Sequence, residues 1–376
     1  MKRNLLLMLG VLIFGLFGYL AFTTFYTESP VANATKKIYS STLYLAGMGG
    51  HFAKADVTID PSNSEEPIKI NSLEKIAIGT KETHPTHDPR IDMNNRNILL
   101  WSTYALDPEG KMHVGKLDLN TGTVIKDVAL VPDKRSPGIK PPLYCGSGQT
   151  KKFYMPVFMG MEAYVDVIDK ETFGLKHRLF VSGLGYTPDT YQMVHGTGSP
   201  DMKKFLVTIN LADAGKGNGK TNFILVDLPS LEKGEWKVLS KNTLAGTPGK
   251  TINFRQYFTN DLRYIFQAMG DRLWILEAAT LKLVDEKMVD GQMHDAMPTP
   301  DGKYGVLTIR NATSAIDPQG NPIPGKNITD GTLKLYDFDA RRIAGKAVST
   351  CQACHKGIGL GDKNAVFCGV DGNWKE

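Results

Sequence analysis

The chain has 376 residues, of which 41% are hydrophobic and 22% are charged, enough for a sizeable buried core in one large domain or two small ones. The formal net charge is +5, and removing residues 1–34 takes away Lys2, Arg3 and Glu28 and leaves +4, scattered along the chain. Such a mild charge argues against nucleic acid as a partner. The 38 glycines and 20 prolines favour many turns and short strands over a helical bundle.

Residues 1–34 are typical of an export signal peptide or an N-terminal membrane anchor. Lys2 and Arg3 form a positive end, residues 5–25 are almost wholly apolar, and Val-Ala-Asn-Ala at 31–34 offers a small-residue cleavage site. The apolar run is nearly long enough to span a bilayer. A cleaved signal and an uncleaved anchor both stay open. Either one predicts a periplasmic or otherwise extracytoplasmic protein, free or anchored to the inner membrane.

An internal repeat fills residues 40–350. One half of the unit is a turn with a charged tip followed by a hydrophobic strand, and it occurs at 199–207 and 299–306, with weaker copies at 259–266 and 92–99. The other half is an alternating strand that ends in an acid, and it occurs at 116–122, 167–169, 225–227, 275–277 and 335–337. A further strand follows each acid, as at 124–131 and 281–289.

Alternating strands between Pro-Asp-Gly and Asn-Thr-Gly turns predict antiparallel pairing, and three or four strands in a unit of about 40–60 residues match a propeller blade. Six units begin near Tyr44, His84, Cys145, His195, Phe254 and His294, and a seventh could lie within the longer units. We therefore expect an all-β fold, a β-propeller of six or seven blades over residues 35–348. A β-sandwich is the rival fold, but it would not repeat the same turn at the same place in each unit.

Histidines recur at one position when the units are aligned on their first strands. His87, His195 and His294 take this position, and Arg255 falls close to it in the fifth unit. Equivalent positions of a propeller lie around its central axis, so these side chains are expected to converge on one mouth. There they could bind a metal, a second haem or a small anionic substrate. The structural alternative is that each histidine only forms a hydrogen bond to the neighbouring blade.

The segment 349–376 contains Cys351-Gln352-Ala353-Cys354-His355, the C-x-x-C-H signature of covalent c-type haem attachment. Two thiols at this spacing can each form a thioether with one vinyl group of the porphyrin, and His355 can ligate the iron as proximal ligand. An exported chain favours this interpretation, because c-type haem is attached outside the cytoplasm.

Two alternatives for these cysteines stay open. The first is a Cys3His zinc site made by Cys351, Cys354, His355 and Cys368, although the adjacent side chains at 354 and 355 point apart. The second is a C-x-x-C redox disulfide, which normally opens a helix in a βαβ unit, and the sequence has no such unit. Cys145 could also pair with Cys368 in a disulfide.

Only 21 residues follow His355, and none is a methionine. This tail is too short for a self-contained cytochrome domain, so we expect it to pack on the propeller. Any sixth iron ligand must then come from earlier in the chain, or else the iron is open to a small molecule. His51, His113 and His177 are expected to be surface or structural residues.

The repeats resemble those of the YVTN-type bacterial propellers and, more distantly, the d-haem propeller of periplasmic nitrite reductases. The resemblance covers residues 40–350 and rests on the short turn motifs given above. It implies the propeller fold and says little about function, because one fold carries many activities. Those nitrite reductases carry their c-type haem in a domain ahead of the propeller, whereas here the motif follows it.

Together these features predict an exported monohaem c-type cytochrome with a β-propeller body, acting in electron transfer with a redox partner protein or within a redox enzyme. One alternative is a propeller scaffold or binding subunit of a larger redox complex. Another is a catalytic propeller with a second metal or haem at the histidine-lined axis. The catalytic residues are unknown, and the candidates are His87, His195, His294 and Arg255.

Overall fold

The computed structural model describes residues 36–136, 143–356 and 359–375. The chain divides into Met1–Lys37 and Ile38–Glu376, and the fold given below is that of the second unit. The predicted signal peptide or membrane anchor of residues 1–34 lies outside the described residues. Among the helices of the described residues, none is both long and apolar enough to cross a membrane.

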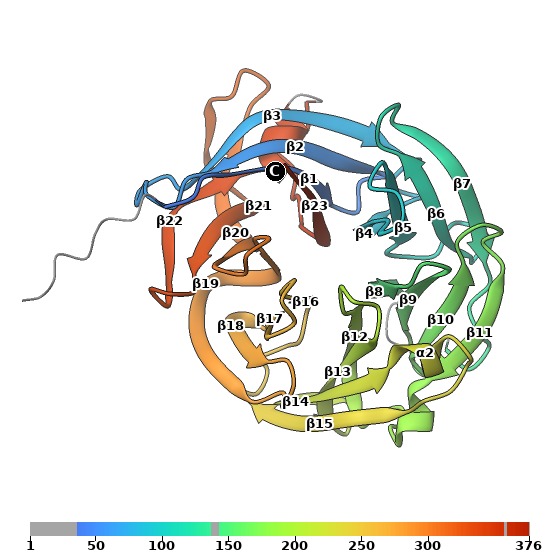
Figure 1. Ribbon diagram of the computed structural model, residues 1–376. Helices are drawn as coiled ribbons and strands as arrows, with labels where there is room; N and C mark the ends of the chain where they lie inside the picture. The colour runs from blue at the N-terminus through green and yellow to red at the C-terminus, as the bar shows by residue number, and fades with distance from the viewer. Residues whose placement is uncertain (1–35, 137–142, 357–358, 376) are drawn as a thin grey trace, which may run out of the picture. The chain divides into compact units, whose positions relative to one another are not determined.

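Antiparallel sheets follow one another around a ring (Figure 1). The first sheet has the order β23 (Gly369–Lys375), β1 (Tyr39–Ala46), β2 (His51–Ile59) and β3 (Ile68–Ala77). The second has β4 (Thr86–Ile91), β5 (Ile98–Thr103), β6 (Met112–Asp118) and β7 (Thr123–Leu130). The third has β8 (Leu143–Gln149), β9 (Phe153–Met159), β10 (Tyr164–Asp169) and β11 (Leu175–Phe180). The fourth has β12 (Tyr191–Gly198), β13 (Lys204–Asp213), β14 (Lys216–Asp227) and β15 (Val238–Ala245).

The remaining strands form one seven-stranded sheet. Its strands are β16 (Gln256–Phe258), β17 (Tyr264–Ala268), β18 (Gly270–Glu277), β19 (Leu283–Pro298), β20 (Tyr304–Ile316), β21 (Pro322–Asp337) and β22 (Arg342–Ser349). The first part of β19 pairs mainly with β18, and its second part, from Gln292 to Pro298, pairs with β20. This long strand therefore serves two successive four-stranded groups.

The innermost strands contact one another in turn. β4, β8, β12, β16, the second part of β19 and β23 follow in this order, and β23 contacts both β19 and β4, so the series closes. The predicted all-β, β-propeller fold is confirmed. Because β19 is shared, two four-stranded groups merge into one seven-stranded sheet, and the blade number of six or seven stays a prediction.

The closing strand comes from the end of the chain. β23 pairs with β1, with Trp374 opposite Ser41 and Val370 opposite Leu45. The segment predicted as a haem-binding tail therefore has two parts. One is the short helix α3 (Cys351–Lys356), and the other is a strand of the first sheet.

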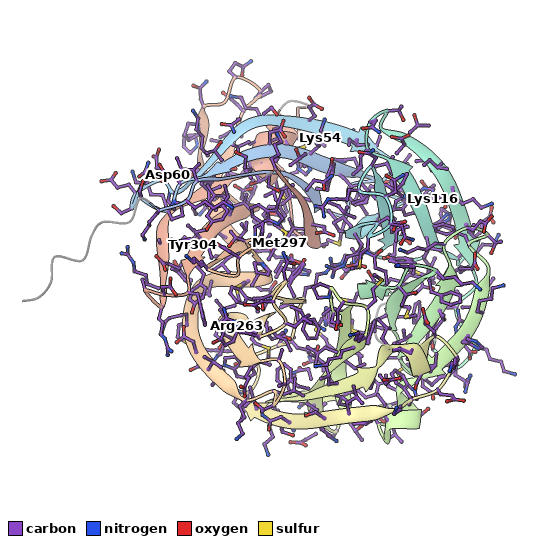
Figure 2. All side chains as sticks on the ribbon, viewed as in Figure 1. Lys54, Asp60, Lys116, Arg263, Met297 and Tyr304 are labelled. Carbon is purple, nitrogen blue, oxygen red and sulfur yellow. The ribbon has the colours of Figure 1, made fainter. Side chains whose placement is uncertain are left out.

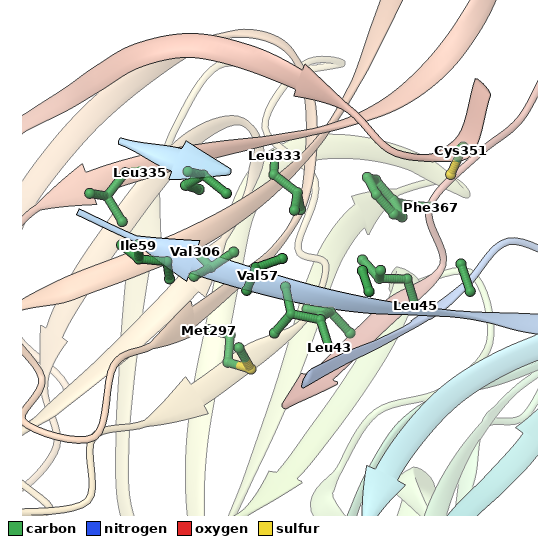
Figure 3. Packing of buried hydrophobic residues seen from close by; sticks show 14 of the residues in the cluster. Leu43, Leu45, Val57, Ile59, Met297, Val306, Leu333, Leu335, Cys351 and Phe367 are labelled. Carbon is green, nitrogen blue, oxygen red and sulfur yellow. The ribbon is translucent and has the colours of Figure 1, made fainter. Parts of the chain in front are cut away.

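Apolar side chains fill the space between the first and last sheets (Figure 3). Alternate residues of β1 and β2 point to this side, because side chains in a strand alternate between its two faces. The cluster includes Leu43, Leu45, Val57, Ile59, Val306, Leu333, Leu335, Phe367 and Cys351. Burial of one such aliphatic side chain stabilises the fold by about 1.5–3 kcal/mol. The first cysteine of the haem motif is thus part of a hydrophobic core.

Two other short helical segments connect strands: η1 (Val181–Leu184) and α2 (Leu228–Leu231). The side chain of Asp227 caps α2 by accepting a hydrogen bond from the backbone N–H of Ser230. Around the axis, the space between the ribbons is occupied by side chains, many of them polar and buried (Figure 2).

Candidate functional site

The haem motif forms the helix α3, which packs against β21 and β3. Cys351, Cys354 and His355 are spaced i, i+3 and i+4, so they share one face of the helix. The backbone N–H of Gln352 donates to Asp330 Oδ1 at 2.8 Å, which fixes the start of the helix on β21. Cys351 is buried, and a side chain at Gly331 of β21 would overlap its Sγ. Cys354 and His355 are partly exposed.

His51, the first residue of β2, lies beside this face. The ring centres of His51 and His355 are 5.9 Å apart, and His51 Nε2 is 3.9 Å from Cys354 Sγ. His51 Nδ1 is 3.0 Å from the carbonyl oxygen of Gly49. Sequence reasoning placed His51 among surface or structural residues and missed this position. No local pattern could have found it, because the contact joins opposite ends of the chain.

The imidazole of His355 in the motif and that of the neighbouring His51 are both neutral at pH 7. Burial lowers the pKa of His51, and burial together with the nearby His51 lowers the pKa of His355 to about 4. Burial also raises the pKa of both motif cysteines. A neutral imidazole is the form that ligates a metal ion.

The residues around α3 fit a covalently attached haem. His355 Nδ1 is buried and has no hydrogen-bond partner among the described residues. Such an orphaned polar atom is costly unless another group satisfies it. A groove of about 890 Å³ between β3 and β22 reaches Ala353 of α3, and neither the motif thiols nor His355 or His51 line it.

The two alternatives for the motif cysteines are not assembled in the structure. All four cysteines are unpaired in the structure, which therefore contains neither a C-x-x-C disulfide nor a Cys145–Cys368 disulfide, and an unpaired C-x-x-C is also the reduced form of a redox pair. Cys145 instead contacts His195, and Cys368 accepts a hydrogen bond from Arg310 Nη2 at 3.5 Å. Among the described residues, Cys368 groups with two axial histidines and not with α3, which excludes the Cys3His zinc site in this arrangement.

The second site is on the axis, where the structure brings the aligned residues together. Arg255, just before β16, donates through Nη2 to His87 Nδ1 of β4 at 3.1 Å. Its backbone N–H donates to the carbonyl oxygen of His294 in β19 at 3.1 Å. The rings of His87 and His294 have centres 6.2 Å apart. His195 of β12 contacts the Sγ of Cys145 in β8.

The glycines beside Cys145 and His195 have a steric reason. Gly146 has φ +82°, and a Cβ at this position would lie 2.8 Å from the carbonyl oxygen of Gly196. A Cβ at Gly148 would lie 2.6 Å from the backbone nitrogen of Gly198. Only glycine allows β8 and β12 to approach this closely near the axis.

A buried ion network supports Arg255. Its Nη1 lies 2.9 Å from Asp88 Oδ1, and its Nε lies 3.9 Å from Asp295 Oδ1. Arg90 Nε lies 3.2 Å from Asp88 Oδ1, and the Tyr257 hydroxyl donates to Asp295 Oδ1 at 2.9 Å. Asp88 and Asp295 were not predicted, although each directly follows an axial histidine, and this repeated His-Asp pair at 87–88 and 294–295 is the signal that could have found them.

The three axial histidines are almost fully buried. His87, His195 and His294 are 1%, 0% and 2% exposed. Burial lowers the pKa of His87 and His195 well below its usual range, and burial with the nearby Arg310 lowers that of His294 to about 4. All three rings are therefore neutral at pH 7.

A cavity of about 320 Å³ adjoins this cluster, lined by His87, Tyr104, Cys145, Phe254, His294, Arg310 and four further residues. His294 Nδ1 is 3.1 Å from Asp295 Oδ2, which orients the ring. Donor atoms of His87, His294 and Cys368 lie within 4.8 Å of one another, close enough for one metal ion. Arg255 can only donate, so its contact with Nδ1 places the ring proton of neutral His87 on Nε2 and disfavours that nitrogen as a metal ligand.

Another cluster lies away from the axis, near the start of β4. Asp127 Oδ2 is 2.9 Å from His84 Nε2, and Asp127 Oδ1 is 2.8 Å from His113 Nδ1. His113 Nε2 is 3.1 Å from Asp107 Oδ2. These ion pairs satisfy the donors without a metal, which agrees with the structural role expected for His113. His177 is exposed on β11.

Comparison with known proteins supplies structural likenesses alone. No family model matches the chain, and no curated protein does. One similar solved structure is Kuenenia stuttgartiensis hydrazine synthase, with a TM-score of 0.44, 13% identity, and coverage of 69% of this chain and 64% of that chain. The Dos1 propeller has a TM-score of 0.42 and 9% identity, with coverage of 79% of this chain and 66% of that chain. The Myceliophteria thermophila Cps50 (Swd1) β-propeller domain has a TM-score of 0.40 and 11% identity, with coverage of 70% of this chain and 86% of that chain. This chain thus spans less than two thirds of the hydrazine synthase chain. At these identities the likeness concerns the fold alone.

Proposed function

We propose that this chain is an exported monohaem c-type redox protein, related to the YVTN-type and d-haem propellers, which passes electrons to or from a partner protein in the periplasm. The observation that carries the proposal is the arrangement of α3. Its two thiols and one imidazole share a face, and the neutral His51 lies opposite them. A bound haem c supplies one-electron redox chemistry.

The residues of this chain hold and shield such a group. Cys351 and Cys354 would form the two thioethers, and His355 would ligate the iron from the same helix. Ile70, Leu73, Val348 and Cys354 pack against the core cluster that contains Cys351. Apolar neighbours of this kind limit the access of water and so affect the reduction potential.

The test is a pyridine haemochrome spectrum with metal analysis on the same sample, produced with co-expressed cytochrome c maturation proteins. We expect one haem c per chain and a haem-staining band under denaturing conditions. Replacement of Cys351 or Cys354 by Ala should weaken retention of the haem, and the double variant should abolish it. Mature wild-type protein without a haem-staining band would refute the proposal.

A second candidate function is supported by the axial cavity. Arg310, His294 and Tyr104 line it, and Arg255 lies behind His87. Buried cationic groups beside neutral imidazoles suit a small anionic substrate better than a bare cation. Additional absorption bands, or metal beyond the haem iron, would instead favour a second cofactor. One c-type signal with no anion binding would leave electron transfer or a scaffold role in a larger complex.

A further inference from the structure

We propose that His51 is the sixth ligand of the haem iron, opposite His355, so that the iron is closed to external ligands. This inference rests on the proposed haem attachment at α3. The first observation is distance: the ring centres of His51 and His355 are 5.9 Å apart. Two imidazoles on opposite sides of one first-row metal ion, each with a metal–nitrogen distance of about 2 Å, have ring centres roughly 6 Å apart.

The second observation is the orientation of the His51 ring. Its Nδ1 lies 3.0 Å from the carbonyl oxygen of Gly49, while Nε2 faces Cys354 of the motif. A hydrogen bond from Nδ1–H to a backbone carbonyl leaves the Nε2 lone pair free for a metal and fixes the tautomer. The Gly49 carbonyl thus provides the supporting contact that metal-binding histidines normally have.

The third observation is how firmly His51 is held. It is 7% exposed and occupies the first position of β2, opposite Ala77 of β3. The hydroxyl of Thr86 donates to its carbonyl oxygen at 2.8 Å, so the backbone at this position is tied to β4. A rigid backbone holds a ligand in place with little entropic cost on binding.

The rival ligand is Lys75 of β3. It is exposed and belongs to the strand that packs against α3. A lysine loses the freedom of a long side chain when it ligates iron. The His51 ring and backbone are already held by Gly49 and Thr86, which favours His51.

The consequence for function is a choice between two kinds of haem protein. An iron with two protein imidazoles exchanges electrons without binding a small molecule, whereas a five-coordinate iron can bind one. Ligation by His51 therefore makes α3 an electron-transfer site and leaves any substrate chemistry to the axial cavity.

The experiment uses the full-length haem-loaded chain and its His51→Ala, His51→Met, Lys75→Ala and His177→Ala variants. Absorption spectra give the spin state, and carbon monoxide titration of the reduced protein measures access to the iron. We expect a six-coordinate low-spin wild type. His51→Ala should become high-spin and bind carbon monoxide roughly tenfold more tightly or better, the scale on which loss of a metal-site residue is felt. Added imidazole should restore the wild-type spectrum.

His51→Met tests the same ligand position without emptying it. We expect it to stay six-coordinate with a higher reduction potential, because methionine in place of histidine raises the potential of haem iron. This variant keeps the test decisive if His51→Ala does not fold. His177→Ala is the matched control from an exposed strand and should behave as wild type.

Two outcomes overturn the inference, and they are distinguishable from failure of the proposed function. A haem-loaded wild type whose spectrum and carbon monoxide affinity are unchanged in both His51 variants would exclude His51 as a ligand. Loss of the low-spin spectrum in Lys75→Ala alone would assign the position to Lys75. Absence of any haem from the mature wild type would instead refute haem attachment itself.

Discussion

Replacing Arg255 by Met would test whether the axial cluster is held by its ion network. Arg255 is fully buried and contacts Asp88 Oδ1 at 2.9 Å and His87 Nδ1 at 3.1 Å. Methionine fills much of the same space without a charge. The variant leaves Asp88 with Arg90 as its only arginine neighbour among the described residues.

The expected loss of stability depends on how far Asp88 and Asp295 remain paired once Arg255 is removed. Removing one partner of a buried ion pair costs about 3–5 kcal/mol, because the other charge stays buried without compensation. Here Arg90 still pairs with Asp88, and the hydroxyls of Tyr257 and Thr308 still donate to Asp295 at 2.9 and 2.7 Å. These partners offset part of the loss, so we expect a decrease in the free energy of unfolding of about 3 kcal/mol, at the lower end of that range.

The assay is equilibrium unfolding in urea, followed by tryptophan fluorescence and circular dichroism. An unchanged denaturant dependence would show that the change lies in stability and not in the cooperativity of unfolding. The control is Arg263→Met, which removes an exposed pair with Asp261 and should leave the unfolding midpoint unchanged. Asp88→Asn combined with Arg255→Met should cost less than the sum of the single variants, because the two side chains interact.

An Arg255→Met protein as stable as Arg263→Met would refute this reasoning. It would show that the axial charges are solvated or that the inner strands relax around them. If the same variant also lost binding of small anions to the axial cavity, Arg255 would belong to the binding site and not to the scaffold. Measuring stability and anion binding on one sample separates these two roles.

Three further predictions can be checked on the haem-free chain. Cys354 should react with a thiol reagent faster than Cys351, because Cys351 is buried in the core, and mass spectrometry of labelled peptides would show equal rates if this is wrong. Phe367→Ala should lower the free energy of unfolding by about 3–5 kcal/mol, since the ring is fully buried, and a change below about 1 kcal/mol would contradict its core position. The carboxylate of Asp127 raises the pKa of His113 above 6.5, so the stability gained from this pair is lost as pH rises through the pKa of His113 in the folded protein. His113 in turn helps to hold the pKa of Asp127 below 3.8, so the stability gained from the ionised carboxylate is lost as pH falls through the pKa of Asp127 in the folded protein. The stability difference between wild type and His113→Gln should therefore be largest between these two limits, and a difference independent of pH would exclude the pairing.

Much of the fold could be predicted because its signals are local. Turn residues and strand alternation repeat within each unit, as at 199–207 and 299–306, and each copy predicts the same strand pair. The closing strand β23 could not be predicted in this way. Its partner β1 lies at the other end of the chain, and nothing in residues 369–375 distinguishes a blade strand from the end of a tail.

The axial site was predictable in position but not in character. Alignment of the repeats places His87, His195 and His294 near the axis, because the blades of a propeller are related by rotation about that axis, so equivalent positions lie at the same distance from it. The burial of these rings and the ion pairs of Arg255 depend on contacts between strands far apart in the sequence, which an alignment of the repeats does not describe.

The end of the chain carries the haem motif and also closes the propeller, and one set of contacts serves both. Asp330 of β21 accepts from the backbone N–H of Gln352, whose side chain donates to the carbonyl oxygen of Ser314 at 2.8 Å. On the other side of the motif, β23 is fixed by its pairing with β1. The helix between these anchors packs against β3, and His51 of β2 lies beside it.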